Sequence, residues 1–277
     1  MKEAGDQLAN AGRHIIEAIT RVLAEGAIAV LATLVNAPPP HTGAKLLIHN
    51  SGAATGGTDD AALDEQIARH ALNFLASRVE AQTFNVEEFA PELAVAWRGG
   101  RVLFERIEPE PRLVICGAGH VGASLARLAH AVGYRVTLID DRADFVARAR
   151  YSGIDIELVA ATEGWERAVR IAVGAGRGVS VAVVTRGHNE DEECLRAVVA
   201  AQPDYAGMIG SRRRTNIVLE RLRESGVAEE VLRGVRAPVG LDIGAVSPEE
   251  VALAILAEIV SERRGGKGAP LSAWRRE

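Results

Sequence analysis

Cysteine and aromatic residues are scarce in this chain, and none of its apolar stretches is long. Its 277 residues include two cysteines, Cys116 and Cys194, too few for a disulfide framework or a zinc site, so we expect a reducing cytoplasmic compartment. No apolar run reaches the roughly 18–20 residues of a membrane span, and residues 1–6 lack the apolar core of a signal peptide. The formal net charge of −5 argues against general affinity for nucleic acid. We therefore expect no membrane and no nucleic-acid partner.

Familiar one-segment signatures of catalysis are also missing. The chain has no G-x-x-x-x-G-K-[S/T] phosphate loop, no H-E-x-x-H zinc helix and no G-x-S-x-G nucleophile elbow. It does have 48% hydrophobic residues and 28 glycines, which suits an α/β protein rich in tight turns. The length allows two domains.

The N-terminal third shows the mixed helix and strand signals of a small α+β domain. Apolar residues at helical spacing predict a helix over 8–25 that ends at Gly26. A second helix is predicted over 59–79, capped by Thr58 or Asp59. The remaining expected elements are strands at 27–35, 44–49, 93–98 and 101–107, a stiff proline loop at 38–40, a loop at 50–58 and a hairpin turn at 99–100.

From residue 112 onward, strand and helix signals alternate, which predicts a doubly wound parallel sheet. The last helix has a clear start, with Ser247 as N-cap, Pro248 after it and Glu250 completing a capping box. The predicted strands are 112–116, 135–139, 156–159, 179–184 and 205–209, and the predicted helices are 120–132, 163–173, 190–201, 211–224 and 248–264. Prolines at 109 and 111 mark a linker, so we expect domains at 1–108 and 109–264 and a mobile tail at 265–277.

The first strand of this second domain leads into Gly117, Gly119 and Gly122, the spacing G-x-G-x-x-G. In that pattern the first glycine turns tightly, the second admits a phosphate and the third lets the following helix pack closely. The helix would begin near His120, where its N-terminus favours an anion. Asp140, at the end of the next strand, is placed to accept hydrogen bonds from a ribose or another polyol. These features favour a nucleotide-type site, and the alternative is a Rossmann-like domain with an empty or repurposed crevice.

Other polar residues follow the remaining strands, at the edge where parallel strands present ligands. His188 and the run Gly210, Ser211 and Arg212 suit a phosphate-bearing ligand. Two histidines without a third ligand favour hydrogen bonding over metal binding for His120 and His188. For several neighbouring residues, we expect a structural role and no contact with a ligand. Those neighbours are Arg213 and Arg214 as a solvated basic face, most of 189–193 as surface acids, Cys194 as packing, and Cys116 as a buried strand residue, with a thiolate at the helix start as the alternative for Cys116.

Six segments of this half resemble the XdhC/CoxI family, the xanthine dehydrogenase accessory proteins. They are 114–122, 139–142, 184–188, 207–213, 238–244 and 247–259. The resemblance implies a protein that binds the molybdenum cofactor, molybdopterin, and is an accessory factor more than an enzyme. It also implies that a cysteine desulfurase supplies sulfur to the cofactor, that a molybdenum hydroxylase apo-enzyme of the xanthine or CO dehydrogenase type receives it, and that the protein forms a homodimer.

The small domain departs from that family at two places. Relatives carry Gly-Gly-Cys-Val-Glu where this chain has Gly56-Gly57-Thr58-Asp59-Asp60, so the thiol is absent. The prolines at 38–40 stand where relatives often have Ser-Ser-Pro-Arg. Two other hypotheses therefore stay open, an NAD(P)-dependent oxidoreductase using the same crevice and a scaffold with a vestigial site. The predicted cofactor-binding residues are Gly117, Gly119, His120, Gly122, Asp140, His188, Gly210, Ser211 and Arg212, with no catalytic or metal-binding residue assigned.

Overall fold

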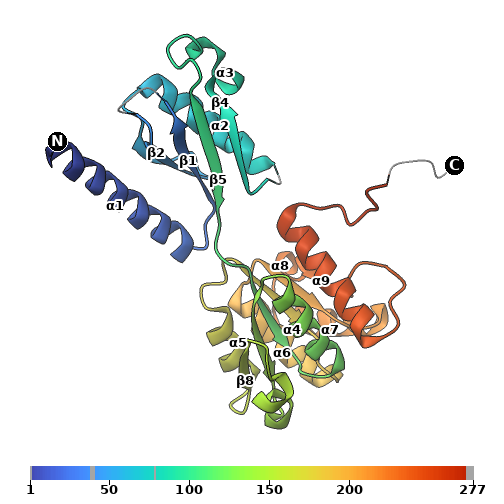
Figure 1. The fold of residues 1–277 in the computed structure, drawn as a ribbon. Coiled ribbons are helices and arrows are strands. Elements are labelled where there is room, and N and C mark those ends of the chain that lie inside the picture. Colours follow the sequence, from blue (N-terminus) through green and yellow to red (C-terminus); the bar gives the residue numbers. More distant parts are fainter. Residues whose placement is uncertain (1, 38–40, 78, 273–277) are drawn as a thin grey trace. The chain divides into compact units, whose positions relative to one another are not determined.

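The computed structural model describes residues 2–37, 41–77 and 79–272, with side chains from residue 12 onward except at 188 and 189. The predicted proline loop at 38–40 and residues 273–277 of the predicted tail lie outside the described residues. The chain divides into two compact units, Met1–Pro109 and Glu110–Glu277, which Figure 1 shows as separate folds. None of the described helices is both long enough and apolar enough to cross a membrane.

The N-terminal unit is built on a five-stranded antiparallel sheet in the order β3-β2-β1-β5-β4. Its strands are β1 (Ala29–Asn36), β2 (Lys45–His49), β3 (Ala54–Gly57), β4 (Ala81–Asn85) and β5 (Arg101–Ile107). Its helices are α1 (Lys2–Ala24), α2 (Ala61–Ala76), the single turn α3 (Val86–Phe89) and the short 3₁₀ helix η1 (Pro91–Leu93). This confirms a small α+β unit.

Alternation along β1 gives the sheet two apolar faces. Ala29 packs with Ile15 and Val22 of α1, whereas Val30 packs with Leu63 and Ile67 of α2. Because successive strand residues point to opposite faces, one helix covers each side of the sheet.

Two predictions near residue 58 are wrong. Part of the predicted loop at 50–58 is strand β3, which pairs with β2 at the sheet edge. Helix α2 is capped by Asp60, whose carboxylate accepts hydrogen bonds from the N–H groups of Ala62 and Leu63, at 2.9 and 3.1 Å. Asp59 has φ +67°, outside the geometry of an N-cap, and the Thr58 hydroxyl is directed to Asp64 instead.

The predicted hairpin at 99–100 is also wrong. Residues 93–98 form no strand, because the chain there follows η1 into a series of turns. Besides β1, β5 pairs with β4, whose polar sequence Ala-Gln-Thr-Phe-Asn carries a weak strand signal. The turn packs tightly at Gly100, where a Cβ would lie 2.8 Å from the carbonyl oxygen of Trp97.

The C-terminal unit contains a parallel sheet in the order β11-β10-β9-β6-β7-β8, which confirms the predicted doubly wound fold (Figure 1). Its strands are β6 (Arg112–Cys116), β7 (Arg135–Asp140), β8 (Glu157–Ala160), β9 (Val179–Val183), β10 (Tyr205–Met208) and β11 (Val235–Arg236). Its helices are α4 (His120–Ala131), α5 (Trp165–Val173), α6 (His188–Ala201), α7 (Arg212–Glu224), α8 (Glu229–Arg233) and α9 (Pro248–Arg264), with 3₁₀ turns η2 (Ala143–Val146) and η3 (Arg148–Tyr151). The short elements α8 and β11 were not predicted, because so few residues carry no clear periodicity.

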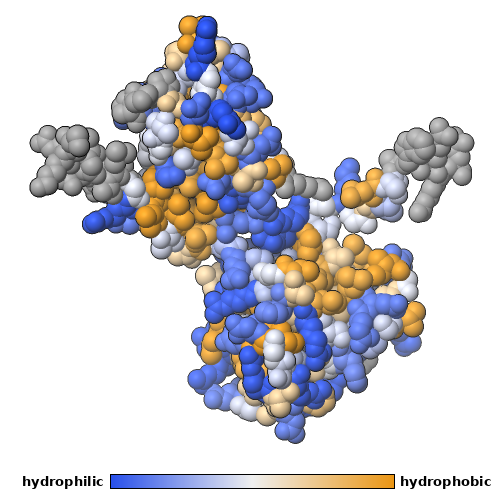
Figure 2. All heavy atoms as spheres, viewed as in Figure 1, coloured by the Kyte–Doolittle hydropathy of each residue, from blue (hydrophilic) through white to orange (hydrophobic). Residues whose placement is uncertain are grey.

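Helices cover both faces of this sheet. Val114 and Cys116 belong to the core formed with α5, α6 and α7, whereas Leu113 and Ile115 belong to the core formed with α4 and α9. Helix α9 begins as predicted, with Ser247 and Glu250 forming a reciprocal capping box. Hydrophobic residues gather on the surface around α9, where Leu253 is 50% exposed (Figure 2).

Candidate functional site

The topology places a switch point between β6 and β9. The chain passes from β6 outward through β7 and β8, and then returns to the other side of β6 to form β9. In open α/β sheets, ligands bind at such a point, outside the carboxyl ends of the strands and beside the loops that follow the two central strands. The loops here are the glycine turn at 117–119 after β6 and the segment 184–187 after β9.

Each of the three motif glycines has a different reason to lack a side chain. Gly117 has φ +112°, and a Cβ there would lie 2.6 Å from the carbonyl oxygen of Val184. A Cβ on Gly122 would lie 1.8 Å from the carbonyl oxygen of Gly117, so α4 packs directly on the turn. A Cβ on Gly119, by contrast, would meet nothing within 4 Å. Gly117 and Gly122 are therefore fixed by the fold itself, and Gly119 faces open space.

Among the helices that begin at this edge of the sheet, α4, α6 and α7 follow β6, β9 and β10, and they differ in how their N-termini are capped. Helices α4 and α6 have Gly119 and Gly187 as N-caps, residues that have no side chain with which to cap the helix. The carboxylate of Glu190, in the first turn of α6, lies beside Gly187, where a Cβ would meet it. Helix α7 is capped by Ser211, whose hydroxyl accepts from Arg214 N at 3.2 Å. Because the first N–H groups of a helix lack intrahelical acceptors, the starts of α4 and α6 can donate to an anion.

The Asp140 carboxylate is not available to accept hydrogen bonds from a ligand at this edge of the sheet. Its side chain is 1% exposed and takes four donors, the N–H of Ala118 at 2.6 Å and the backbone N, Nε and Nη2 of Arg142 at 2.9, 2.8 and 3.0 Å. A carboxylate offers about four lone-pair positions, so this one is fully used inside the protein. Asp140 holds the glycine turn to the end of β7, and the geometry gives no support to its predicted contact with a ribose.

Arg186 and Asp141 connect the two loops on either side of that turn. The guanidinium donates through Nη1 and Nη2 to the two carboxylate oxygens, at 2.9 and 3.0 Å. This hydrogen bonding lowers the pKa of Asp141 below its usual range, against the opposing effect of partial burial. Arg186 was not among the predicted site residues, although it lies within one of the segments that resemble the XdhC/CoxI family.

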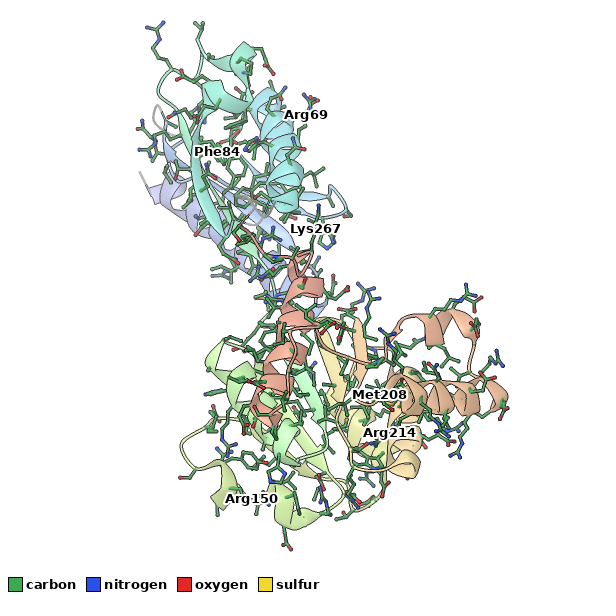
Figure 3. The ribbon with its side chains drawn as sticks, turned by 90° about the vertical axis from the view of Figure 1, so that its right-hand side faces the viewer. Arg69, Phe84, Arg150, Met208, Arg214 and Lys267 are labelled. Atoms are coloured by element: carbon green, nitrogen blue, oxygen red, sulfur yellow. The ribbon has the colours of Figure 1, made fainter. Side chains whose placement is uncertain are left out.

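A buried ion pair ties α6 to α7 beside the crevice. Asp191 is 0% exposed, and it accepts from the Nε of Arg214 at 2.6 Å and from the hydroxyl of Thr185. The prediction that Arg214 lies on a solvated basic face is therefore wrong, and Asp191 is not a surface acid. Figure 3 labels Arg214 together with Met208 at the end of β10. A charge run cannot reveal one member that turns inward, because helical spacing places every third or fourth residue on the buried side.

The other predicted site residues lie at the same edge of the sheet but make fewer contacts. His120 is exposed at the start of α4, and Gly210, Ser211 and Arg212 follow β10, which is separated from β6 by β9. Within the described residues, Arg212 makes no ion pair. The side chain of His188 lies outside the described part of the chain, although its backbone begins α6.

The two cysteines are buried neighbours beneath the turn. Both are 0% exposed and pack in one core, which agrees with the buried-strand interpretation of Cys116. Burial, followed by a hydrogen bond with Cys116, raises the pKa of the Cys194 thiol well above its usual range. Both thiols therefore belong to the core and are not exposed to a ligand.

Position 58 of the N-terminal unit is equally enclosed. Thr58 is 1% exposed, and its hydroxyl donates to Asp64 at 2.7 Å. His41 Nδ1 lies 2.9 Å from the Thr58 carbonyl oxygen, and Trp97 donates to Asp60 at 3.0 Å. Among the described residues, no three His, Cys, Asp or Glu side chains are grouped so as to hold a metal ion.

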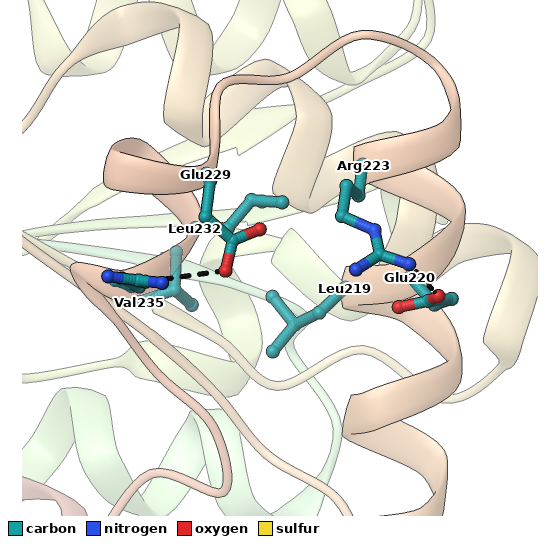
Figure 4. A pocket seen from close by; sticks show the side chains of 7 residues that line it. Leu219, Glu220, Arg223, Glu229, Leu232 and Val235 are labelled. Atoms are coloured by element: carbon teal, nitrogen blue, oxygen red, sulfur yellow. Dashed lines mark hydrogen bonds and ion pairs between the residues drawn. The ribbon is translucent and has the colours of Figure 1, made fainter.

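A cavity of about 320 Å³ lies elsewhere in the C-terminal unit, between α7, α8 and β11 (Figure 4). Its charged residues are paired within the wall, Arg223 with Glu220 and Arg233 with Glu229. Its α7 residues come from the second half of that helix, away from the N-terminus that lies at the carboxyl edge. The cavity is therefore separate from the switch point.

Comparison with known families matches residues 113–259 to the XdhC Rossmann domain. The chain belongs to this family. The match spans β6 to α9, so every predicted site residue lies within the XdhC Rossmann domain.

Two curated proteins are among the relatives of this chain. The chain is 28% identical over 59% of its length to a Bacillus subtilis protein described as a probable xanthine dehydrogenase subunit, of which it covers 46%. It is 37% identical over 27% of its length to the molybdenum cofactor insertion chaperone PaoD of Escherichia coli, of which it covers 24%. The chain thus spans less than half the length of the curated relatives it matches.

A crystal structure described as a xanthine dehydrogenase from Bacillus halodurans has the same fold, with a TM-score of 0.50 and 17% identity. The similarity covers 94% of this chain and 97% of that one. It therefore extends beyond the XdhC Rossmann domain into the N-terminal unit.

Proposed function

We propose that this chain is an accessory protein that binds the molybdenum cofactor through its XdhC Rossmann domain. The observation that carries the proposal is the family match over the carboxyl edge of the sheet, where α4 and α6 begin at glycine N-caps. The similarity to a protein named as a molybdenum cofactor insertion chaperone supports the same role.

The residues at the crevice fit the chemistry of such a ligand. Molybdopterin carries a phosphate, and the N-termini of α4 and α6 offer backbone donors to an anion. Open space at Gly119 leaves room for a group to approach the start of α4. His120 and Ser211 are exposed at the same edge, where they can hydrogen-bond polar parts of the ligand.

These donor groups favour recognition of the cofactor through its phosphate and its pterin edges. Among the described residues no cluster of metal-ligating side chains exists, and Thr58 is enclosed by its hydrogen bond to Asp64. The cofactor would supply the molybdenum chemistry of a client enzyme, and this chain would bind and orient it and shield it from water. Gly117, Gly122 and Asp140 would shape the turn, and Gly119, His120, His188, Gly210, Ser211 and Arg212 would surround the ligand.

A second part of the proposal concerns the proteins with which this chain acts. We infer that the protein protects the cofactor during sulfuration by a cysteine desulfurase and delivers it to a molybdenum hydroxylase apo-enzyme of the xanthine or CO dehydrogenase type. Similarity to a protein described as a xanthine dehydrogenase component supports such a client. A homodimer working in the cytoplasm completes the proposal.

The geometry does not favour the alternative of an NAD(P)-dependent oxidoreductase. An NAD site needs an acid at the end of the second strand to accept from the ribose hydroxyls. In this chain, the acceptor positions of Asp140 are taken by Ala118 and Arg142.

The test is a titration of the full chain with molybdenum cofactor and, in parallel, with NAD. We expect stoichiometric cofactor binding that Gly119→Val abolishes, because the new side chain would fill the open space at the turn. Gly12→Val is the matched control, since Gly12 also faces open space but lies on α1. Binding of NAD alone would support the oxidoreductase, and binding of neither would support a vestigial scaffold.

A further inference from the structure

The arginines at the carboxyl edge of the sheet differ in how firmly they are held. Arg142 is fixed by the buried Asp140 and by the Phe145 ring, whose centroid lies 3.5 Å from its Cζ. Arg214 is fixed by the buried Asp191. The main partner of Arg186, Asp141, is 32% exposed, whereas the main partners of Arg142 and Arg214 are buried. Arg186 is 46% exposed and is therefore the most easily released of the three.

The position of this pair is set by the strand register. Cys116 at the end of β6 is opposite Ile139 of β7 on one side and Val183 of β9 on the other. Asp141 follows β7 and Arg186 follows β9, so the pair joins the two loops that flank the glycine turn. Its bidentate geometry is the one that arginine also adopts toward phosphate.

We propose that Arg186 is an anion-binding residue of the switch-point site and that Asp141 competes with the ligand for its guanidinium. A phosphoryl group at the starts of α4 and α6 would take over the two N–H donors that Asp141 now accepts. Glu190, 3.7 Å from Arg186, and Arg142, 3.9 Å from Asp141, would remain near the separated partners. The identity of the full ligand rests on the proposed function, whereas the competition concerns the anion alone.

The competition predicts effects of opposite sign for the two partners. Asp141→Asn should tighten anion binding about fivefold, the gain expected when an exposed ion pair no longer has to be broken. Arg186→Gln should weaken it about tenfold through loss of a charged bidentate donor. The double variant should bind like Arg186→Gln, because removing the competitor helps only while the arginine is present.

The experiment is calorimetric titration of the full chain and these three variants with inorganic pyrophosphate. Glu220→Gln is the matched control, because it also removes one negative charge from an exposed ion pair, but at the separate cavity between α7 and α8. Thermal melts of each variant check that folding is unchanged, as expected for a pair this exposed.

The proposal is overturned if Asp141→Asn binds pyrophosphate no more tightly than Glu220→Gln does, or if the double variant keeps the tighter binding. A second titration with molybdenum cofactor separates the two claims. If the pyrophosphate pattern appears but no variant binds the cofactor, the assignment of Arg186 stands and the proposed function fails.

Discussion

Gly122 lies so close to Gly117 that a Cβ on the first would be 1.8 Å from the carbonyl oxygen of the second. The contact joins the first turn of α4 to the glycine turn after β6. It explains why Gly122 is needed even with no ligand to accommodate, since close packing of the helix on the turn already requires it. Gly117 is needed for a separate reason, its φ of +112° and the Val184 carbonyl oxygen beside it. Only the third, Gly119, is left for a role in binding.

This difference predicts a large loss of stability for one alanine substitution and a small loss for another. Gly122→Ala should lower the free energy of unfolding by about 3 kcal/mol, the upper part of the usual range for overpacking, because backbone must move to relieve the overlap. Gly119→Ala should cost less than about 1 kcal/mol, since its Cβ meets nothing within 4 Å. Urea unfolding of both variants measures this, and equal losses would contradict the packing argument.

The helix caps allow a second stability test. Ser247 accepts from Glu250 N at 3.2 Å, and Glu250 accepts in return from Ser247 N at 2.9 Å. Ser247→Ala should cost about 1 kcal/mol in urea unfolding. Ser261→Ala near the other end of α9 is a suitable comparison, because it changes the same atoms outside the cap. Unfolding midpoints that match between the two variants would mean that the capping box adds nothing.

His70 predicts an acid sensitivity of the N-terminal unit. Its ring lies among Phe84, Phe89 and Phe104, with centroids 4.5 to 5.0 Å away, and burial lowers its pKa below the usual 6.5. The unfolded chain therefore binds more protons than the folded one just below pH 6.5. The contribution of neutral His70 to folding stability is complete above that pH and is lost as the pH falls. The protection factors of α2 amides, which correct exchange rates for their intrinsic pH dependence, should fall on acidification in the wild type and less so in His70→Phe. A His70→Phe profile identical to the wild type would assign the sensitivity to another group.

Thiol reactivity tests the burial of the two cysteines. We expect Cys116 and Cys194 to react with an aromatic disulfide reagent only after unfolding, because both are fully buried and the pKa of Cys194 is raised. Absorbance of the released thiolate, with and without denaturant, gives the rates. Rapid labelling of native Cys116 would restore the view of a thiolate at the start of α4.

Sequence patterns predicted the C-terminal unit well and the N-terminal unit less well, for physical reasons. Parallel strands buried on both faces read as continuous apolar runs, and β6 was predicted at its observed bounds of Arg112–Cys116. By contrast β3 (Ala-Thr-Gly-Gly) and β4 (Ala-Gln-Thr-Phe-Asn) lie at the sheet edges and are largely exposed, so they carry little periodicity. Helix α9 was predicted because a capping box is a local signal.

Long-range pairing limited the prediction of the site. The spacing of Gly117, Gly119 and Gly122 predicted the tight turn between β6 and α4, but nothing local shows that Asp140 bonds the turn. Arg186 meets a carboxylate 45 residues away and Arg214 meets one 23 residues away. Such partners are chosen by the strand order, which brings β9 next to β6.

The buried pair of Asp191 and Arg214 makes the most demanding prediction. Asp191→Asn removes the charge that compensates Arg214 and should lower the free energy of unfolding by about 3–5 kcal/mol. Arg214→Met leaves Asp191 buried without its cation and should cost a similar amount. The double variant should cost clearly less than the sum, because no uncompensated charge remains, and a double-mutant cycle in urea measures this coupling. Additive losses would mean that groups other than Arg214, such as the Thr185 hydroxyl, hold the Asp191 carboxylate. Because the pair links α6 to α7, each single variant should also weaken anion binding at the start of α6, whereas the charge-free double variant should recover part of it.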